Sequence, residues 1–265
     1  MADDQKRQDP SDMPGRDSDG NVSSLFEQKK ERAGLRRGIY LLPNLITTGA
    51  LFSGFYAIIS AMSGSLQQAA IAIVVAGFLD ALDGRIARMT NTQSEFGVQY
   101  DSLSDMVAFG VAPAVLMFSW VLSDLGKIGW MVAFLYMACA ALRLARFNTK
   151  PDSRVFFGLA SPAAAGTIAT TVWVWSEYMI TPVNFELGVT LAIVTALVAL
   201  LMVSSIRYYS PKQLNMKEGV PYAHMLGIVA LFALVFANPP VVLLVIAICY
   251  ICSGPIQGLL RRQSH

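Results

Sequence analysis

Charged residues are scarce in this chain of 265 residues. Asp, Glu, Lys and Arg make up 14% of it and hydrophobic residues 54%, whereas soluble domains carry about 25% charged residues. Cysteine is also rare, and three Cys exclude a disulfide framework of the secreted type. The net charge of +2, with no basic face outside the ends and loops, argues against nucleic-acid binding. The composition therefore predicts an integral membrane protein.

Residues 1–38 differ in composition from everything that follows. They carry eight of the 18 acidic and eight of the 20 basic residues and few apolar ones. Such a segment buries too little apolar surface to offset the entropy lost on ordering, so we expect a disordered, charged cytoplasmic tail. It lacks the apolar core of a signal peptide. Its basic stretch 29–37 could rest on anionic lipid head groups.

The membrane domain is expected to cover residues 39–258, with a short cytoplasmic tail at 259–265. Within it the sequence contains apolar segments that are each close to the length of a membrane-spanning helix. The last two are separated only by Asn238-Pro239-Pro240, where proline predicts a turn. The fold class is thus an all-α bundle of about eight transmembrane helices, at roughly 39–61, 66–88, 97–122, 129–149, 159–180, 187–206, 220–237 and 239–258.

The distribution of basic residues supports this topology. With eight spans, both termini and every second loop lie on the same side of the membrane. That side receives all of the 20 Lys and Arg residues except Lys127. The positive-inside rule then predicts a multi-pass protein of the inner (plasma) membrane with both termini in the cytoplasm.

Four aspartates lie at the ends of apolar segments, and an isolated charge costs at least about 2.5 kcal/mol at the centre of a membrane helix. Asp80 and Asp83 are three residues apart and Asp101 and Asp105 four apart, so each pair shares one face of a helix. A short turn near residues 89–96 would make the two helices antiparallel neighbours with both pairs at one depth. The alternative is that these carboxylates only pair with arginines at the helix ends.

Four carboxylates at close quarters repel each other unless cations lie between them. Carboxylate oxygens suit Mg²⁺ or Mn²⁺, which bind a few carboxylates together with substrate phosphates. The sequence therefore predicts a divalent-metal site, with two ions clamping a phosphoryl group.

The spacing Asp80-x2-Asp83-Gly84-x2-Ala87-Arg88-x8-Gly97-x3-Asp101-x3-Asp105 resembles the signature of the CDP-alcohol phosphotransferases. The resemblance implies a membrane bundle that transfers a phosphatidyl group from a CDP-linked lipid to an alcohol and releases CMP. It also implies that all four aspartates bind metal, that Asp105 is in addition the catalytic base, and that the protein is a homodimer. The residues implied to bind the CDP-lipid are Asn44, Thr47, Gly84, Ala87, Arg88, Ser94 and Gly97.

Further motifs resemble the phosphatidylserine synthase branch of this family. They lie at residues 108–114, 141–148, 157–166 and 202–209. Two positions depart from the branch: Ala160 stands where proline is frequent, and Pro211 stands where an aromatic residue usually precedes Lys212. The implied reaction uses CDP-diacylglycerol and L-serine. Candidates for contacts to serine or to a lipid phosphate are Arg143, Arg146, Ser204, Ser205 and Arg207, although the arginines could equally be cytoplasmic anchors of helix ends.

Two alternatives remain open at this point. The same chemistry could use another acceptor, glycerol 3-phosphate or an inositol phosphate. The alternative of another class is a cation transporter, which predicts broken helices and carboxylates near the bilayer midplane. The sequence instead places its aspartates at segment ends, beside a short basic loop, which favours the enzyme.

Overall fold

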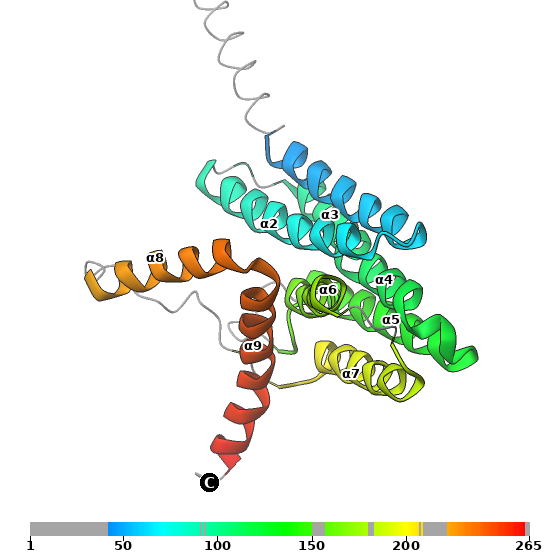
Figure 1. Ribbon diagram of the computed structural model, residues 1–265. Helices are drawn as coiled ribbons and strands as arrows, with labels where there is room; N and C mark the ends of the chain where they lie inside the picture. Colours follow the sequence, from blue (N-terminus) through cyan, green and yellow to red (C-terminus); the bar gives the residue numbers. More distant parts are fainter. Residues whose placement is uncertain are drawn as a thin grey trace, which may run out of the picture. The chain divides into compact units, whose positions relative to one another are not determined.

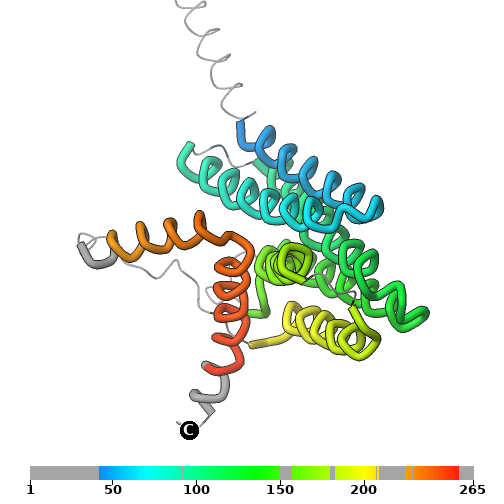
Figure 2. Tube along the Cα trace, in the orientation of Figure 1, coloured from blue at the N-terminus to red at the C-terminus, as the bar shows by residue number. Residues whose placement is uncertain are grey.

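A computed structural model describes residues 42–90, 92, 94–149, 157–179, 183–206, 208 and 222–262. The chain divides into two compact units, Met1–Leu42 and Pro43–His265. The predicted tail 1–38 lies outside the described residues. Everything described after Leu42 belongs to the second unit and is largely helical (Figures 1 and 2).

Each apolar segment predicted from the sequence coincides with a helix, and the predicted turn at Asn238 separates two of them. The third segment is continuous but changes its helical type along its length. The described helices are Leu42–Met62, α2 (Leu66–Thr90), α3 (Glu95–Asp105), the π-helix η1 (Met106–Val111), α4 (Ala112–Trp120), the 3₁₀-helix η2 (Leu122–Leu125), α5 (Lys127–Thr149), α6 (Ser161–Tyr178), α7 (Phe185–Val203), α8 (Tyr222–Ala237) and α9 (Pro239–Arg262).

Five of these helical stretches are long and apolar enough to cross a membrane, so the chain is a multi-pass membrane protein. The helices α2, α6 and α8 do not meet the same measure of length and hydropathy, so the count of eight spans stays a prediction. The five are Leu42–Met62, Glu95–Trp120, Lys127–Thr149, Phe185–Val203 and Pro239–Ile256.

Small residues allow the helices to approach one another closely, as is common between helices in membranes. The helix Leu42–Met62 meets η1 at Gly54, where a Cβ would lie only 2.8 Å from the Cα of Ala108. Alanines supply many of the fully buried positions, among them Ala57, Ala69 and Ala76. The helix α6 packs against both α2 and α9, while α5 packs against α7.

The π-helix η1 has an identifiable local cause. Pro113 is the second residue of α4, and proline has no N–H to donate to the carbonyl four residues before it, which here belongs to Phe109. The hydroxyl of Tyr136 on α5 donates to that carbonyl at 3.2 Å, and Tyr136 is completely buried. The irregular turn directly after Asp105 is thus stabilised from a neighbouring helix, and single π-turns of this kind are frequent at functional sites.

A tight backbone connection joins the start of α6 to the end of α7. Gly158 has φ +79°, and a Cβ there would collide with the carbonyl of Met202, so only glycine fits without strain. The amide of Gly158 donates to Ile206 at 2.9 Å, and that of Leu159 donates to Leu201 at 2.9 Å. These bonds fix where α6 begins.

Candidate active site

Three of the four predicted aspartates converge. Asp80 on α2 and Asp101 and Asp105 on α3 each offer a carboxylate oxygen, and these oxygens lie within 4.8 Å of one another. All three side chains are partly buried. The prediction that carboxylates from the two helices face each other is confirmed for these three residues.

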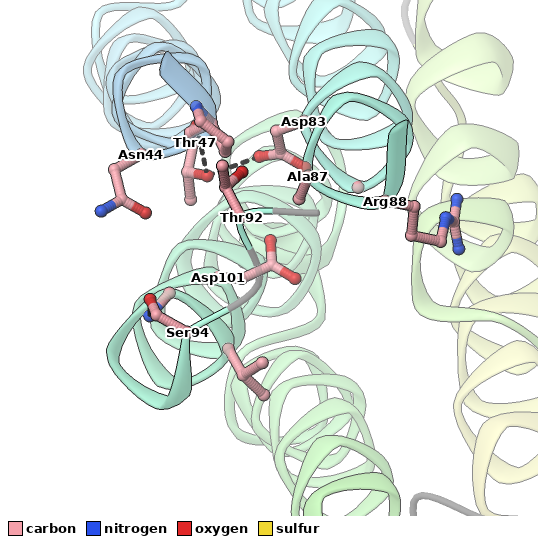
Figure 3. A pocket seen from close by; sticks show the side chains of 12 residues that line it. Asn44, Thr47, Asp83, Ala87, Arg88, Thr92, Ser94 and Asp101 are labelled. Carbon is pink, nitrogen blue, oxygen red and sulfur yellow. Dashed lines mark hydrogen bonds between the residues drawn. The ribbon is translucent and has the colours of Figure 1, made fainter. Parts of the chain in front are cut away.

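Asp83 is held differently. Its carboxylate accepts a hydrogen bond of 2.6 Å from the hydroxyl of Thr47, on the helix Leu42–Met62, and Asp83 is buried. Thr47 also donates to the carbonyl of Pro43 at 3.0 Å. Figure 3 shows both bonds, with the carboxylate of Asp101 across the cavity from Asp83. The helix Leu42–Met62 lies outside the aspartate motif, yet it orients the carboxylate of Asp83.

A cavity of about 210 Å³ opens beside the aspartates. All seven residues predicted to bind the CDP-lipid line it, together with Asp83 and Asp101. Sequence reasoning did not single out Thr92 or Val98 as contacts, because nothing in the local pattern marks them. The full lining is Pro43, Asn44, Thr47, Asp83, Gly84, Ala87, Arg88, Thr92, Ser94, Gly97, Val98 and Asp101 (Figure 3).

Ser94 has a structural role at one wall of this cavity. It is the N-cap of α3, and its hydroxyl accepts a 3.0 Å hydrogen bond from the amide of Gly97. A Cβ on Gly97 would come within 3.1 Å of that hydroxyl and 3.4 Å of the side-chain oxygen of Asn44. Glycine at this position therefore lets the polar groups of Ser94 and Asn44 lie side by side along the wall.

The second predicted glycine leaves open space. A Cβ added to Gly84 would meet only the guanidinium of Arg88, at 4.0 Å. The backbone of α2 is thus accessible at this turn of the cavity, and an arginine lies beside it. Both features suit a phosphate-bearing ligand, because arginine offers a planar set of donors to phosphate oxygens.

Among the residues that the structure describes, the predicted serine-binding positions do not form one cluster of contacts. Arg143 is buried and donates to Ser161 at 2.7 Å. Arg146 is exposed, with its guanidinium 5.6 Å from the centre of the Phe157 ring.

Ser204 donates to the carbonyl of Leu201 at 2.8 Å, and Ser205 is exposed. Arg207 lies outside the described residues. Their role in binding serine therefore stays a prediction.

The donor set fits a divalent metal. Carboxylate oxygens are the ligands that Mg²⁺ and Mn²⁺ prefer, and three carboxylates that close together repel each other without a cation between them. The cluster of Asp80, Asp101 and Asp105 could therefore hold a divalent ion. The neighbouring cavity, with its accessible backbone and an arginine, has room for a phosphorylated ligand.

These features define a class: a multi-pass membrane protein that is largely helical in its described part, with a carboxylate cluster that could hold a divalent metal beside a cavity. Comparison with known proteins narrows this class. The sequence model described as CDP-alcohol phosphatidyltransferase matches residues 40–185, more than half of the chain. The chain belongs to this family and is therefore a transferase.

Similar proteins carry consistent names. The chain is 38% identical over 224 residues to the CDP-diacylglycerol–serine O-phosphatidyltransferase of Helicobacter pylori, which covers 83% of this chain and 92% of the relative. It is 38% identical to the archaetidylserine synthase of Methanothermobacter thermautotrophicus, over 63% of this chain and 69% of the relative. The serine O-phosphatidyltransferase of Bacillus subtilis is 33% identical, over 63% of this chain and 89% of the relative.

Proposed function

We propose that this protein transfers the phosphatidyl group of CDP-diacylglycerol to the hydroxyl of L-serine, giving phosphatidylserine and CMP. The observation that carries the proposal is the 38% identity over 92% of a relative named for this reaction. The cluster of Asp80, Asp101 and Asp105 supplies the groups that such a reaction needs. Membership of a transferase family favours this reading over cation transport.

The cavity lining supports a binding mode for the nucleotide lipid. Arg88 and the open backbone at Gly84 would contact the diphosphate, while Asn44 and Ser94 offer polar groups to the nucleotide. Thr47 and Asp83, joined by their hydrogen bond, would form the end of the cavity nearest the acidic cluster. Of the residues predicted to bind the CDP-lipid, the remaining two, Ala87 and Gly97, are small and leave room for the ligand.

The reaction exchanges one P–O bond for another. The serine hydroxyl oxygen bonds to the phosphorus of the phosphatidyl group, and the bond from that phosphorus to the oxygen leading to CMP breaks. CMP leaves with that oxygen. We assign Asp105 as the base that accepts the hydroxyl proton, because an alcohol is a weak nucleophile until a positioned group takes its proton.

We assign Asp80, Asp83, Asp101 and Asp105 as the metal ligands. One or two Mg²⁺ or Mn²⁺ ions bound there would neutralise the diphosphate and stabilise CMP as the leaving group. The helices α2 and α3 position the carboxylates that would hold the ions. In such transfers, positioning of the reacting groups and charge neutralisation provide most of the catalysis.

The proposal includes a place in the cell. We propose a bundle of eight spans in the inner membrane over residues 39–258, with both termini cytoplasmic and a homodimeric assembly. The basic residues gathered in alternate loops support the orientation. The acyl chains would then stay in the bilayer while serine and CMP exchange with the cytoplasm.

The test is release of CMP by the purified protein in detergent with CDP-diacylglycerol and Mg²⁺ or Mn²⁺. L-Serine, glycerol 3-phosphate and inositol phosphate are added separately, and Asp105→Asn serves as the inactive control. We expect CMP release that requires serine and a divalent ion and that falls at least a hundredfold in the variant. Release with another alcohol instead would keep the transferase and overturn serine as the acceptor.

A further inference from the structure

Arg143 places a guanidinium in the interior of the helical unit. Its side chain is only 8% exposed, and one terminal nitrogen donates to the hydroxyl of Ser161, which is completely buried. Its Nε is buried without a hydrogen-bond partner in the described part of the chain. A buried cation costs several kcal/mol unless an anion compensates it. Asp105 attracts this guanidinium, which also lies 5.5 Å from the centre of the Phe147 ring. The unbonded Nε therefore leaves Arg143 a donor that an anionic ligand close to Asp105 can use.

The residue that Arg143 contacts stands at the start of a helix. Ser161 is the first residue of α6, and the N-cap, Ala160, makes no side-chain hydrogen bond to the helix. The first amides of a helix lack partners within it and carry partial positive charge. Pro162 has no N–H, so the amides that this end offers are those of Ser161 and Ala163. Such an end favours anions. The arginine and the helix end thus favour negative charge at one place.

This place lies at the depth of the acidic cluster. On α5, Asn148 hydrogen-bonds Ser102 at 3.2 Å or less. Ala140 is also on α5, and its Cβ would lie 3.4 Å from a Cβ added to Gly110 of η1. Arg143 lies between Ala140 and Asn148 along α5, so it lies opposite the part of the neighbouring segment that contains Asp105.

The helix α6 also adjoins α2 close to the cluster of Asp80, Asp101 and Asp105. Pro162 and Ala163 of α6 and Gly77 of α2 line one cavity. Asp80 follows Gly77 by three residues, which is about one helical turn. The start of α6 is therefore a neighbour of the helix turn that carries Asp80.

Arg143 is separate from the cavity assigned to the nucleotide lipid. That cavity has its own arginine, Arg88, and neither Arg143 nor Ser161 lines it. Arg143 is therefore a second cationic group, outside that cavity, for a different anion, one that belongs to the acceptor.

We propose that Arg143, Ser161 and the N-terminal amides of α6 form the subsite that binds the carboxylate of the acceptor, with the acceptor's hydroxyl directed to Asp105. This rests on the proposed function, and it adds a selection rule: the enzyme prefers hydroxy amino acids over amino alcohols of the same size. A guanidinium suits a carboxylate because it can donate two parallel hydrogen bonds.

The test compares L-serine with serinol, which has a hydroxymethyl group in place of the carboxylate. CMP release is measured for both acceptors with the wild type, Arg143→Gln, Arg143→Lys and Ser161→Ala. We expect Arg143→Gln to raise the serine KM at least tenfold, to leave the KM for CDP-diacylglycerol within about twofold, and to lower the preference for serine over serinol at least tenfold. Ser161→Ala should shift the same preference severalfold.

Arg85→Gln is the matched control, because it removes an exposed positive charge from the same end of the bundle. Monodisperse elution in detergent checks folding, and Arg143→Lys, which keeps the charge, serves if Arg143→Gln does not fold. A preference for serine that is unchanged in every variant would overturn the subsite, as would an equal rise in the KM for the CDP-lipid. A wild type that releases no CMP with serine would instead refute the proposed function.

Discussion

At the scale of single residues, the hydrogen bond between Thr47 and Asp83 is the most consequential contact at the candidate site. It joins residues 36 positions apart at 2.6 Å and orients a carboxylate that has three other aspartates nearby in the sequence. Hydrogen bonds to charged groups contribute about 1.5–3 kcal/mol. Groups that orient metal ligands are also worth about 10- to 100-fold in affinity or activity.

We therefore expect Thr47→Val to raise the concentration of Mg²⁺ needed for half-maximal CMP release and to lower kcat/KM about 10- to 100-fold. The measurement is a titration of activity with the divalent ion at saturating substrates. Thr48→Val is the control, because Thr48 is exposed, bonds Asn44 and Tyr100 and does not line the cavity. A Thr47→Val variant with unchanged metal dependence would contradict an orienting role.

The Thr47–Asp83 bond also marks where reasoning from the sequence ends. The sequence predicted that Asp101 and Asp105 meet Asp80, because carboxylates four residues apart share a helix face and a short turn makes the two helices neighbours. The partner of Asp83 depends on how a separate helix packs, and helix packing cannot be predicted from local periodicity. The same holds for Arg143 and Ser161: both were visible as residue types, but their contact is long-range.

At the scale of secondary-structure elements, η1 connects the acidic cluster to the core. It begins directly after Asp105 and is held by the bond from Tyr136 to Phe109 and by the close approach of Gly54 to Ala108. The apolar segment predicted the helix as a whole. The change to π-helical geometry was not predicted, although Pro113 is a local signal for a missing hydrogen bond.

We expect Gly54→Ala to disturb this element, since the new Cβ would lie 2.8 Å from backbone atoms of Ala108. Overpacking of this kind typically costs about 1–3 kcal/mol, so the unfolding temperature in detergent should fall together with the rate of CMP release.

Gly49→Ala, in the same helix, is the control, because its Cβ would meet only the side chain of Leu79, at 3.5 Å. Equal unfolding temperatures for the two variants would show that η1 tolerates a wider helix spacing.

At the scale of the whole molecule, the prediction concerns orientation in the membrane. The positive-inside pattern places the turn near Ser63 outside and the end of α2 near Met89 inside. Both residues are exposed. Single cysteines at these positions, in a chain whose three native Cys are replaced, can report the side of each.

We expect a membrane-impermeant maleimide to label Ser63→Cys in right-side-out vesicles and Met89→Cys in inverted ones. The opposite pattern would place the acidic cluster on the wrong side for cytoplasmic serine. Labelling of both positions from one side would instead contradict α2 as a span.

The cavity lining has a consequence for how such enzymes diversify. Its residues all fall between positions 43 and 101, with Asp105 directly after, whereas α6 starts only at Ser161. One uninterrupted stretch of the gene therefore encodes the part that would hold the activated lipid, and a later stretch encodes the part proposed to hold the acceptor. Mutation or recombination in the later stretch could exchange the acceptor while the inherited chemistry stays intact.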